Sequence, residues 1–260
     1  YNLQRLGPNH PAIADDLGEI DRVVGGLIQF FENRRIEVML VSEYGISEVD
    51  KPVHINRVLR EKGFIAIKDE LGLEQLDCGA SRAFAMADHQ VAHVYVNDES
   101  AREEVRAILE GVDGVESVWG DEEKAIHGMD HRRSGDFVVT AEERAWFTYY
   151  YWLDDAVAPD FARCVDIHRK AGYDPVELFI DPQLKFPMLK VAKFLLKKKM
   201  GFRALMDVIP LDAGLVRGSH GRVPSDESEW PLLIGKGVGE RDLDSGEVYE
   251  AILKAVRGSK

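Results

Sequence analysis

A nearly continuous apolar run at residues 36–42 is the feature that most constrains the fold of this chain. Apolar residues that do not alternate with polar ones indicate a strand buried on both faces, as in a parallel sheet. The strand is expected to stop at Ser42-Glu43-Tyr44-Gly45. Ligands of open α/β sheets bind beyond the carboxyl ends of strands, so Glu43 lies where chemistry is usually done. Taken alone, however, Glu43 is better explained as a cap or turn residue.

The rest of the chain alternates short strand and helix patterns. Residues 11–33 carry apolar side chains at helical spacing. Asp244 and Glu247 resemble the capping box of a C-terminal helix that runs to residue 256. The same reasoning predicts helices at residues 53–62 and 101–109, and strands at residues 64–68, 81–87, 91–96, 115–119, 136–140 and 230–234.

With 260 residues, 45% of them hydrophobic, the chain can form one large core or a core with a smaller inserted domain. The mixture of short strands and helices at residues 63–140 suits an inserted α+β cap. We assign residues 1–62 and 205–260 to the core domain, and residues 141–204 to long loops and a basic helix that return to it. Packing roles are predicted for His89, His93 and the aromatic residues of 146–152.

Residues 186–200 form a basic amphipathic pattern. Such a helix can bind a membrane or an anion, but a solvated helix with its lysines outward is the favoured interpretation. The sequence contains no apolar run of about 18 or more residues, so no transmembrane helix is expected. The net charge of -13 argues against general nucleic-acid binding. Cys78 and Cys164 are too few for a disulfide framework, so we expect both to be reduced and buried, and the protein to be cytoplasmic.

The sharpest local motif is Gly218-Ser219-His220-Gly221, flanked by Arg217 and Arg222. Two glycines allow a tight turn that presents the imidazole, and neutral histidine is a common ligand for zinc and similar ions. The arginines suit a phosphate, which they can bind with paired N–H donors. By spacing alone, a metal or phosphate site and an ordinary surface loop are equally well supported interpretations of this motif. Asp166 and His168 form a weaker pair, which suits a metal or a structural hydrogen bond equally well.

The order of these motifs resembles the nucleotide pyrophosphatase/phosphodiesterase branch of the alkaline phosphatase superfamily. The resemblance rests on Asn2-Leu3-Gln4-Arg5-Leu6-Gly7-Pro8, then the strand ending Ser42-Glu43-Tyr44-Gly45, then the Gly-x-His-Gly motif at 218–221. It implies a three-layer αβα alkaline-phosphatase-like core with an inserted small α+β cap. It also implies a metal-dependent hydrolase that acts on a small phosphorylated substrate, of the phosphodiester or pyrophosphate type.

The resemblance carries metal-ligand roles over to His220, Glu43 and Gln4, and more weakly to Tyr44, with Asp166 and His168 as replacements. Zinc is the metal that it implies, with manganese or magnesium as alternatives. Gln4 stands where the family has histidine, and Glu43-Tyr44 replaces an Asp-His pair. Tyrosine is a poor zinc ligand compared with histidine. Such substitutions fit either a divergent hydrolase or a degenerate member that binds a phosphorylated ligand or a partner without cleaving it.

The family's nucleophile is expected upstream of Tyr1, in a missing N-terminal segment of the same domain. A sulfatase or phosphomutase on the same scaffold would need a modified cysteine or a serine there. Neither Cys78 nor Cys164 lies in an obvious nucleophile context.

Overall fold

The computed structural model describes residues 1–166, 168–239 and 241–258 of the chain. The helices are α1 Asn2–Leu6, α2 Ile13–Glu32, α3 Ile55–Glu61, α4 Arg102–Glu110, α5 Asp121–Ile126, α6 Pro187–Lys199 and α7 Ser245–Gly258. The strands are β1 Met39–Val41, β2 Ser47–Glu48, β3 Lys51–Val53, β4 Ile67–Glu70, β5 Leu73–Leu76, β6 Ala83–Asp88, β7 Val91–Val96, β8 Val115–Trp119, β9 Phe137–Ala141, β10 Ala145–Phe147, β11 Gly218–Ser219 and β12 Leu233–Gly235. Nearly all predicted elements are confirmed, although the strand expected at residues 64–68 lies at Ile67–Glu70.

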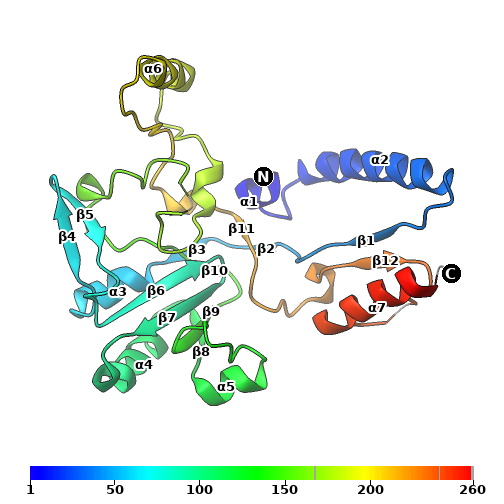
Figure 1. The fold of residues 1–260 in the computed structure, drawn as a ribbon, viewed down its shortest axis with the longest axis horizontal. Coiled ribbons are helices and arrows are strands. Elements are labelled where there is room, and N and C mark those ends of the chain that lie inside the picture. The colour runs from blue at the N-terminus through cyan, green and yellow to red at the C-terminus, as the bar shows by residue number, and fades with distance from the viewer. Residues whose placement is uncertain (167, 240, 259–260) are drawn as a thin grey trace.

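The largest sheet has four antiparallel strands in the order β6-β7-β9-β8 (Figure 1). Every second residue of β6 and β7 is buried, and most of these buried residues are alanines. Their small side chains leave room for α3 and α4, whose Leu59 and Leu109 are fully buried in the same core. Helix α3 therefore belongs physically with this sheet, although its residues precede the predicted cap at 63–140. The predicted domain limits themselves stay a prediction.

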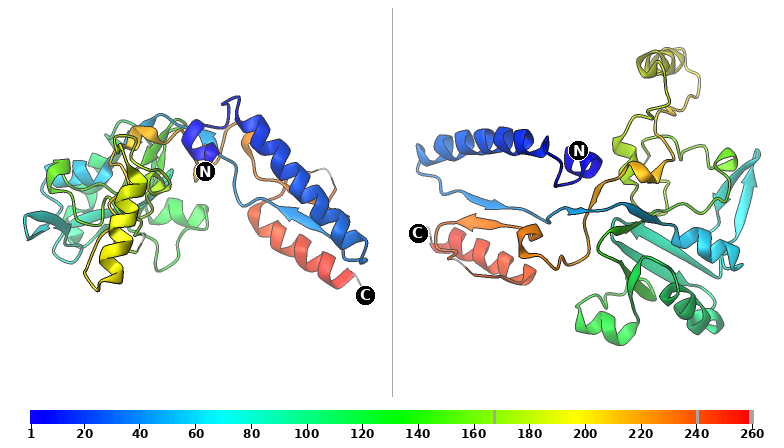
Figure 2. Two further views of the ribbon diagram at one scale, coloured as in Figure 1. Left: turned by 90° about the horizontal axis from the view of Figure 1, so that it is seen from above. Right: turned by 180° about the vertical axis from the view of Figure 1, so that it is seen from behind.

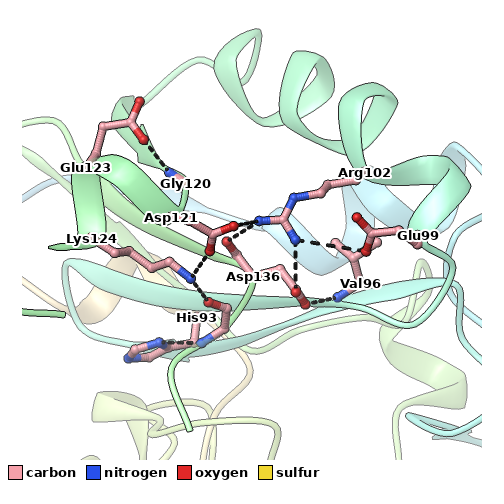
Figure 3. Close-up of polar contacts among 10 residues, drawn as sticks. His93, Val96, Glu99, Arg102, Gly120, Asp121, Glu123, Lys124 and Asp136 are labelled. Carbon is pink, nitrogen blue, oxygen red and sulfur yellow. Dashed lines mark hydrogen bonds and ion pairs between the residues drawn. The ribbon is translucent and has the colours of Figure 1, made fainter. Parts of the chain in front are cut away.

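A partly buried polar network ties α4 and α5 to this sheet (Figure 3). The Arg102 guanidinium pairs with Asp121 at 2.8 Å and with Asp136 at 3.2 Å. Lys124, whose side chain is 8% exposed, donates to the Gly135 carbonyl at 2.8 Å and pairs with Asp121. Because these cations have partners on both helix and strand, their burial is compensated.

A second core lies in the long loops that follow β10. Trp146, Tyr149, Tyr150, Tyr151 and Trp152 are at most 1% exposed, which confirms their predicted packing role. The loops are held by short 3-10 helices and by pairing of β10 with β3 rather than by long strands.

The terminal segments form a separate lobe in which α2 and α7 lie on opposite sides of the β1–β12 ribbon (Figures 1 and 2). Strand β1 pairs antiparallel with β12, and Val41 is 50% exposed. The prediction of a parallel strand buried on both faces is therefore wrong for the described residues. Helix α2 also exposes apolar side chains, namely Leu17, Ile20, Val23, Leu27 and Phe30.

The mixed α/β class is confirmed, while the three-layer arrangement of the predicted core stays a prediction. Both cysteines are free, and Cys164 is buried. Cys78 is exposed, so the expectation that both thiols are buried is wrong for it. Among the described residues, no helix has the length and apolar character that crossing a membrane requires.

Candidate functional site

Strand pairing brings the motif segments of the sequence together. Residues 218 and 219 of β11 pair antiparallel with residues 48 and 47 of β2, so the Glu43-Tyr44 segment and the His220 loop are neighbours. Helix α1 joins them, because the Arg217 N–H donates to the Gln4 carbonyl at 2.7 Å. Motif segments that are about 40 to 215 residues apart in the sequence therefore meet at one place.

Gly218 is needed for this meeting. A Cβ atom at this position would lie 2.2 Å from the Leu3 carbonyl oxygen and 2.8 Å from Cγ2 of Ile46. Only glycine lets the backbone of β11 approach α1 this closely. The first glycine of the motif thus serves the contact between segments.

The His220 imidazole lies between two aromatic rings. The Tyr44 ring stacks on it with a centroid distance of 3.6 Å and an interplanar angle of 10°. On the other side, the His89 ring lies 3.9 Å away at 34°, and the Tyr173 ring stacks on His89 at 5.0 Å. His220 is therefore held through the faces of its ring.

His89 is the residue of this stack that sequence reasoning assigned to packing alone. It is 3% exposed, it has a positive φ of 55° in the β6–β7 turn, and its Nδ1 lies 3.0 Å from Ser219 Oγ. The next residue, Gln90, donates its N–H to the His220 carbonyl at 2.9 Å. The turn thus anchors the His220 loop, and no local motif marks this role because the partners are 130 residues apart.

Tyr173 was likewise not predicted, and a buried ion network supports it. Its N–H donates to the Ala87 carbonyl at 2.8 Å. On either side of it, the Lys170 ammonium pairs with Asp174 at 3.1 Å and with Glu177 at 2.6 Å. All three side chains are at most 4% exposed. The network fixes the segment that places Tyr173 against His89.

The electrostatics of the stack favour neutral histidines. Burial, together with the charge of His220, lowers the pKa of His89 to about 3. Burial also lowers the pKa of His220, while the Glu43 carboxylate acts in the opposite direction. A neutral imidazole has a free lone pair, which is the form that binds metal ions.

The two predicted phosphate-binding arginines differ in their surroundings. The Arg222 guanidinium makes a two-pronged ion pair with Glu116, with N–O distances of 2.8 and 2.7 Å. This pair links the His220 loop to β8, so its donors are already occupied. The exposed Arg217 side chain makes no hydrogen bond or ion pair in the part of the chain that the structure describes. Arg217 is thus the freer of the two.

The remaining predicted ligands do not form a closed metal shell. Gln4 Oε1 is buried without a hydrogen-bond partner, and Tyr44 presents its ring face to His220. Asp166 is partly buried and His168 is exposed, and no side-chain contact joins either to His220. Across residues 1–166, 168–239 and 241–258, no three His, Cys, Asp or Glu side chains are grouped so that they could hold a metal ion.

Two hollows lie away from the predicted site residues. One, of about 540 Å³, is lined by His54, Arg57 and Tyr150 among others. The other, of about 730 Å³, lies between α6 and the loops of the second core. Neither hollow is lined by a predicted site residue, so both are separate from the place where the motifs converge.

The fold and the converging motifs define a mixed α/β protein with a histidine-centred polar site. The sequence profile of the family described as type I phosphodiesterase / nucleotide pyrophosphatase matches residues 1–174, and the chain belongs to this family. The match includes the Gln4 and Glu43-Tyr44 segments. It ends before His220, whose place in the site follows from the pairing of β11 with β2.

Solved structures give weaker likenesses. Human ectonucleotide pyrophosphatase/phosphodiesterase 5 shares 17% identity over 56% of this chain, with a TM-score of 0.41. Phosphonoacetate hydrolase from Sinorhizobium meliloti, in complex with phosphonoformate, shares 18% identity over 62%, with a TM-score of 0.42. The matches span 36% and 39% of those two chains. No curated protein sequence matches this chain. The family assignment therefore rests on the sequence profile.

Proposed function

We propose that this chain forms the C-terminal part of a divalent-metal-dependent hydrolase of phosphate esters, of the phosphodiester or pyrophosphate type. The observation that carries the proposal is the meeting of α1, the Glu43-Tyr44 segment and the His220 loop in a member of this family. In this proposal Glu43 and His220 are metal ligands and Gln4 is a neutral oxygen donor.

The chemistry of the donors supports a divergent metal site. Burial lowers the pKa of His220, which favours its neutral form, and the carboxylate of Glu43 is close enough to raise that pKa. Gln4 Oε1 is a buried acceptor that lacks a donor, and a cation would satisfy it. A set of one carboxylate, one amide oxygen and one imidazole can bind zinc, manganese or magnesium. It distinguishes among these metals less strongly than a histidine-rich set does. A divalent ion bound there supplies charge stabilisation for the phosphoryl group.

The chain's own residues then bind and orient the substrate. Arg217 is the freer guanidinium and can bind a phosphate oxygen pair through its planar donors. Arg222 can do so only after releasing Glu116. Tyr44 and His89 hold the His220 ring through stacking. The nucleophile is expected from residues upstream of Tyr1.

The apolar face of α2 supports the presence of more of the same domain. Leu17, Ile20 and Leu27 are 51–59% exposed, and the chain spans only 36% of the human relative. We propose that a further segment of this domain covers α2 and extends the β1–β12 ribbon. Contiguous exposed apolar surface of this kind typically marks an interaction site.

Hydrolysis by the whole natural chain tests the proposal. Bis-p-nitrophenyl phosphate and p-nitrophenyl phosphate are supplied with zinc, manganese or magnesium, and p-nitrophenol release is followed. Turnover with at least one metal is expected, with a loss of at least about a hundredfold in His220→Ala. His131→Ala, an exposed histidine on the loop before β9, is the matched control and keeps its activity.

The same assay distinguishes the proposed hydrolase from a degenerate family member that binds a phosphorylated ligand without cleaving it. No turnover with any metal, together with thermal stabilisation by a phosphorylated ligand, identifies a member that binds without cleaving. Turnover that survives His220→Ala contradicts the assigned site.

A further inference from the structure

Helix α6 and its flanks carry a concentrated positive charge. Residues 185–203 contain six lysines, one arginine and no acidic residue, in a chain whose net charge is -13. Lys190 pairs with Asp207 and Arg203 with Asp160. The ammonium groups of the other five lysines make no ion pair or hydrogen bond with any described residue: Lys185, Lys193, Lys197, Lys198 and Lys199. This segment therefore has a strong attraction for an anionic partner.

The apolar stripe of α6 points away from the protein. Helix α6 projects from the body at the end of two loop segments (Figure 1). Five apolar side chains at helical spacing are 56–74% exposed: Met188, Leu189, Leu195, Leu196 and Met200. Val191 is only partly exposed and packs against the second core. Lys185, Lys193, Lys197, Lys198 and Lys199 are exposed, which agrees with a solvated helix with its lysines outward, but an apolar stripe is exposed beside them.

The ends of the helix extend this surface. Phe186 just before α6 is 73% exposed, and Phe202 just after it is 63% exposed. An outward apolar stripe with aromatic residues at its ends and lysines beside it is the pattern of a helix that lies in a membrane interface. Lysine side chains suit that position because their alkyl stems lie along apolar surface while the ammonium groups reach the headgroups.

We propose that α6 binds the surface of a bilayer that contains anionic lipids, with the acidic body of the protein facing away. The unpaired lysines beside the apolar stripe favour an anionic bilayer over a neutral one. Charge also sets the orientation, because the rest of the chain carries excess negative charge that an anionic surface repels. This surface is separate from the site around His220.

Vesicle flotation with the whole chain tests the proposal. Vesicles of phosphatidylglycerol and phosphatidylcholine in equal parts are compared with vesicles of phosphatidylcholine alone. Binding to the anionic vesicles, and its loss at about 1 M salt, is expected. Lys197→Gln/Lys198→Gln/Lys199→Gln weakens partitioning about a hundredfold. Leu195→Ser/Leu196→Ser abolishes detectable binding.

The matched control removes the same charge elsewhere. Lys62, Lys236 and Lys254 are exposed and lie outside α6, so their triple change to glutamine leaves vesicle binding within about twofold. Equal weakening by the two triple variants overturns the proposal. Failure of the unaltered chain to bind anionic vesicles at low salt does so too. A dimer that dissociates in Leu195→Ser/Leu196→Ser, without vesicle binding, shows instead that the stripe covers a second copy. If either variant misfolds, the salt dependence of the unaltered chain decides.

Discussion

Replacing Lys170 by methionine is expected to destabilise the protein by about 3–5 kcal/mol at neutral pH. The Lys170 ammonium lies 3.1 Å from Asp174 Oδ2 and 2.6 Å from Glu177 Oε1, and the three side chains are 0%, 1% and 4% exposed. Methionine retains an unbranched side chain against the Tyr149 ring but removes the charge. The carboxyl groups of Asp174 and Glu177 then share a buried site without a cation. Uncompensated buried charge of this kind lowers the free energy of unfolding.

The loss should depend on pH. Burial raises the pKa of Asp174 from 3.8 to about 6, although Lys170 lowers it. Because the folded-state pKa exceeds the unfolded one, the native protein binds more protons between these values, and stability falls as pH rises through them. A difference of about two pH units corresponds to about 3 kcal/mol. Without Lys170 the folded-state pKa rises further, so the variant loses most stability above about pH 7.

Urea unfolding, followed by the fluorescence of the buried Trp146 and Trp152, measures the effect. Lys190→Met is the matched control, because its ion pair with Asp207 is 35% and 47% exposed and is worth less than about 1 kcal/mol. The loss in Lys170→Met should be smaller at about pH 5 than at about pH 7.5. Equal losses in the two variants, or a larger loss at the lower pH, would show that Lys170 does not stabilise the buried carboxylates by its charge.

Two further substitutions probe how the site is held. Gly172→Ala places a Cβ 1.9 Å from the Ala87 carbonyl oxygen at a φ of 123°, so thermal unfolding should show a loss of at least about 2 kcal/mol. Gly63→Ala, at a φ of 82° with no atom within 4 Å, should lose only about 1 kcal/mol; equal losses would contradict the steric argument. Tyr44→Phe keeps the ring on His220 and should leave hydrolysis within about threefold, whereas loss of activity would make the Tyr44 hydroxyl a ligand.

Local periodicity predicts the elements of this chain well. The spacing of apolar residues predicts the helices α2 and α4 and the individual strands β6 and β7, because each pattern lies within one segment. The aromatic run at 146–152 was also correctly assigned to a core, since such bulky side chains contribute most when buried.

Pairing between distant segments could not be predicted in the same way. The apolar run before Glu43 was expected to lie inside a parallel sheet, yet β1 pairs only with β12 among the described strands. The burial of β1 depends on which strands pair with it, and the pattern of one strand does not identify its partners. The placement of His89 beside His220 likewise depends on contact between the β6–β7 turn and Ser219, which is 130 residues away in the sequence. Amphipathic spacing predicts that α6 has an apolar face. The spacing does not predict whether that face points toward the protein or, as the structure shows, away from it.

The proposed function depends on a divalent metal bound by His220 and Glu43. The most direct measurement is the metal content of the purified whole natural chain, by elemental analysis, beside His220→Ala and Glu43→Ala. We expect zinc, manganese or magnesium in the unaltered chain and its loss in both variants, with His131→Ala unchanged. No metal in the unaltered chain, or full retention of the metal by both variants, would rule out a metal site at His220 and Glu43.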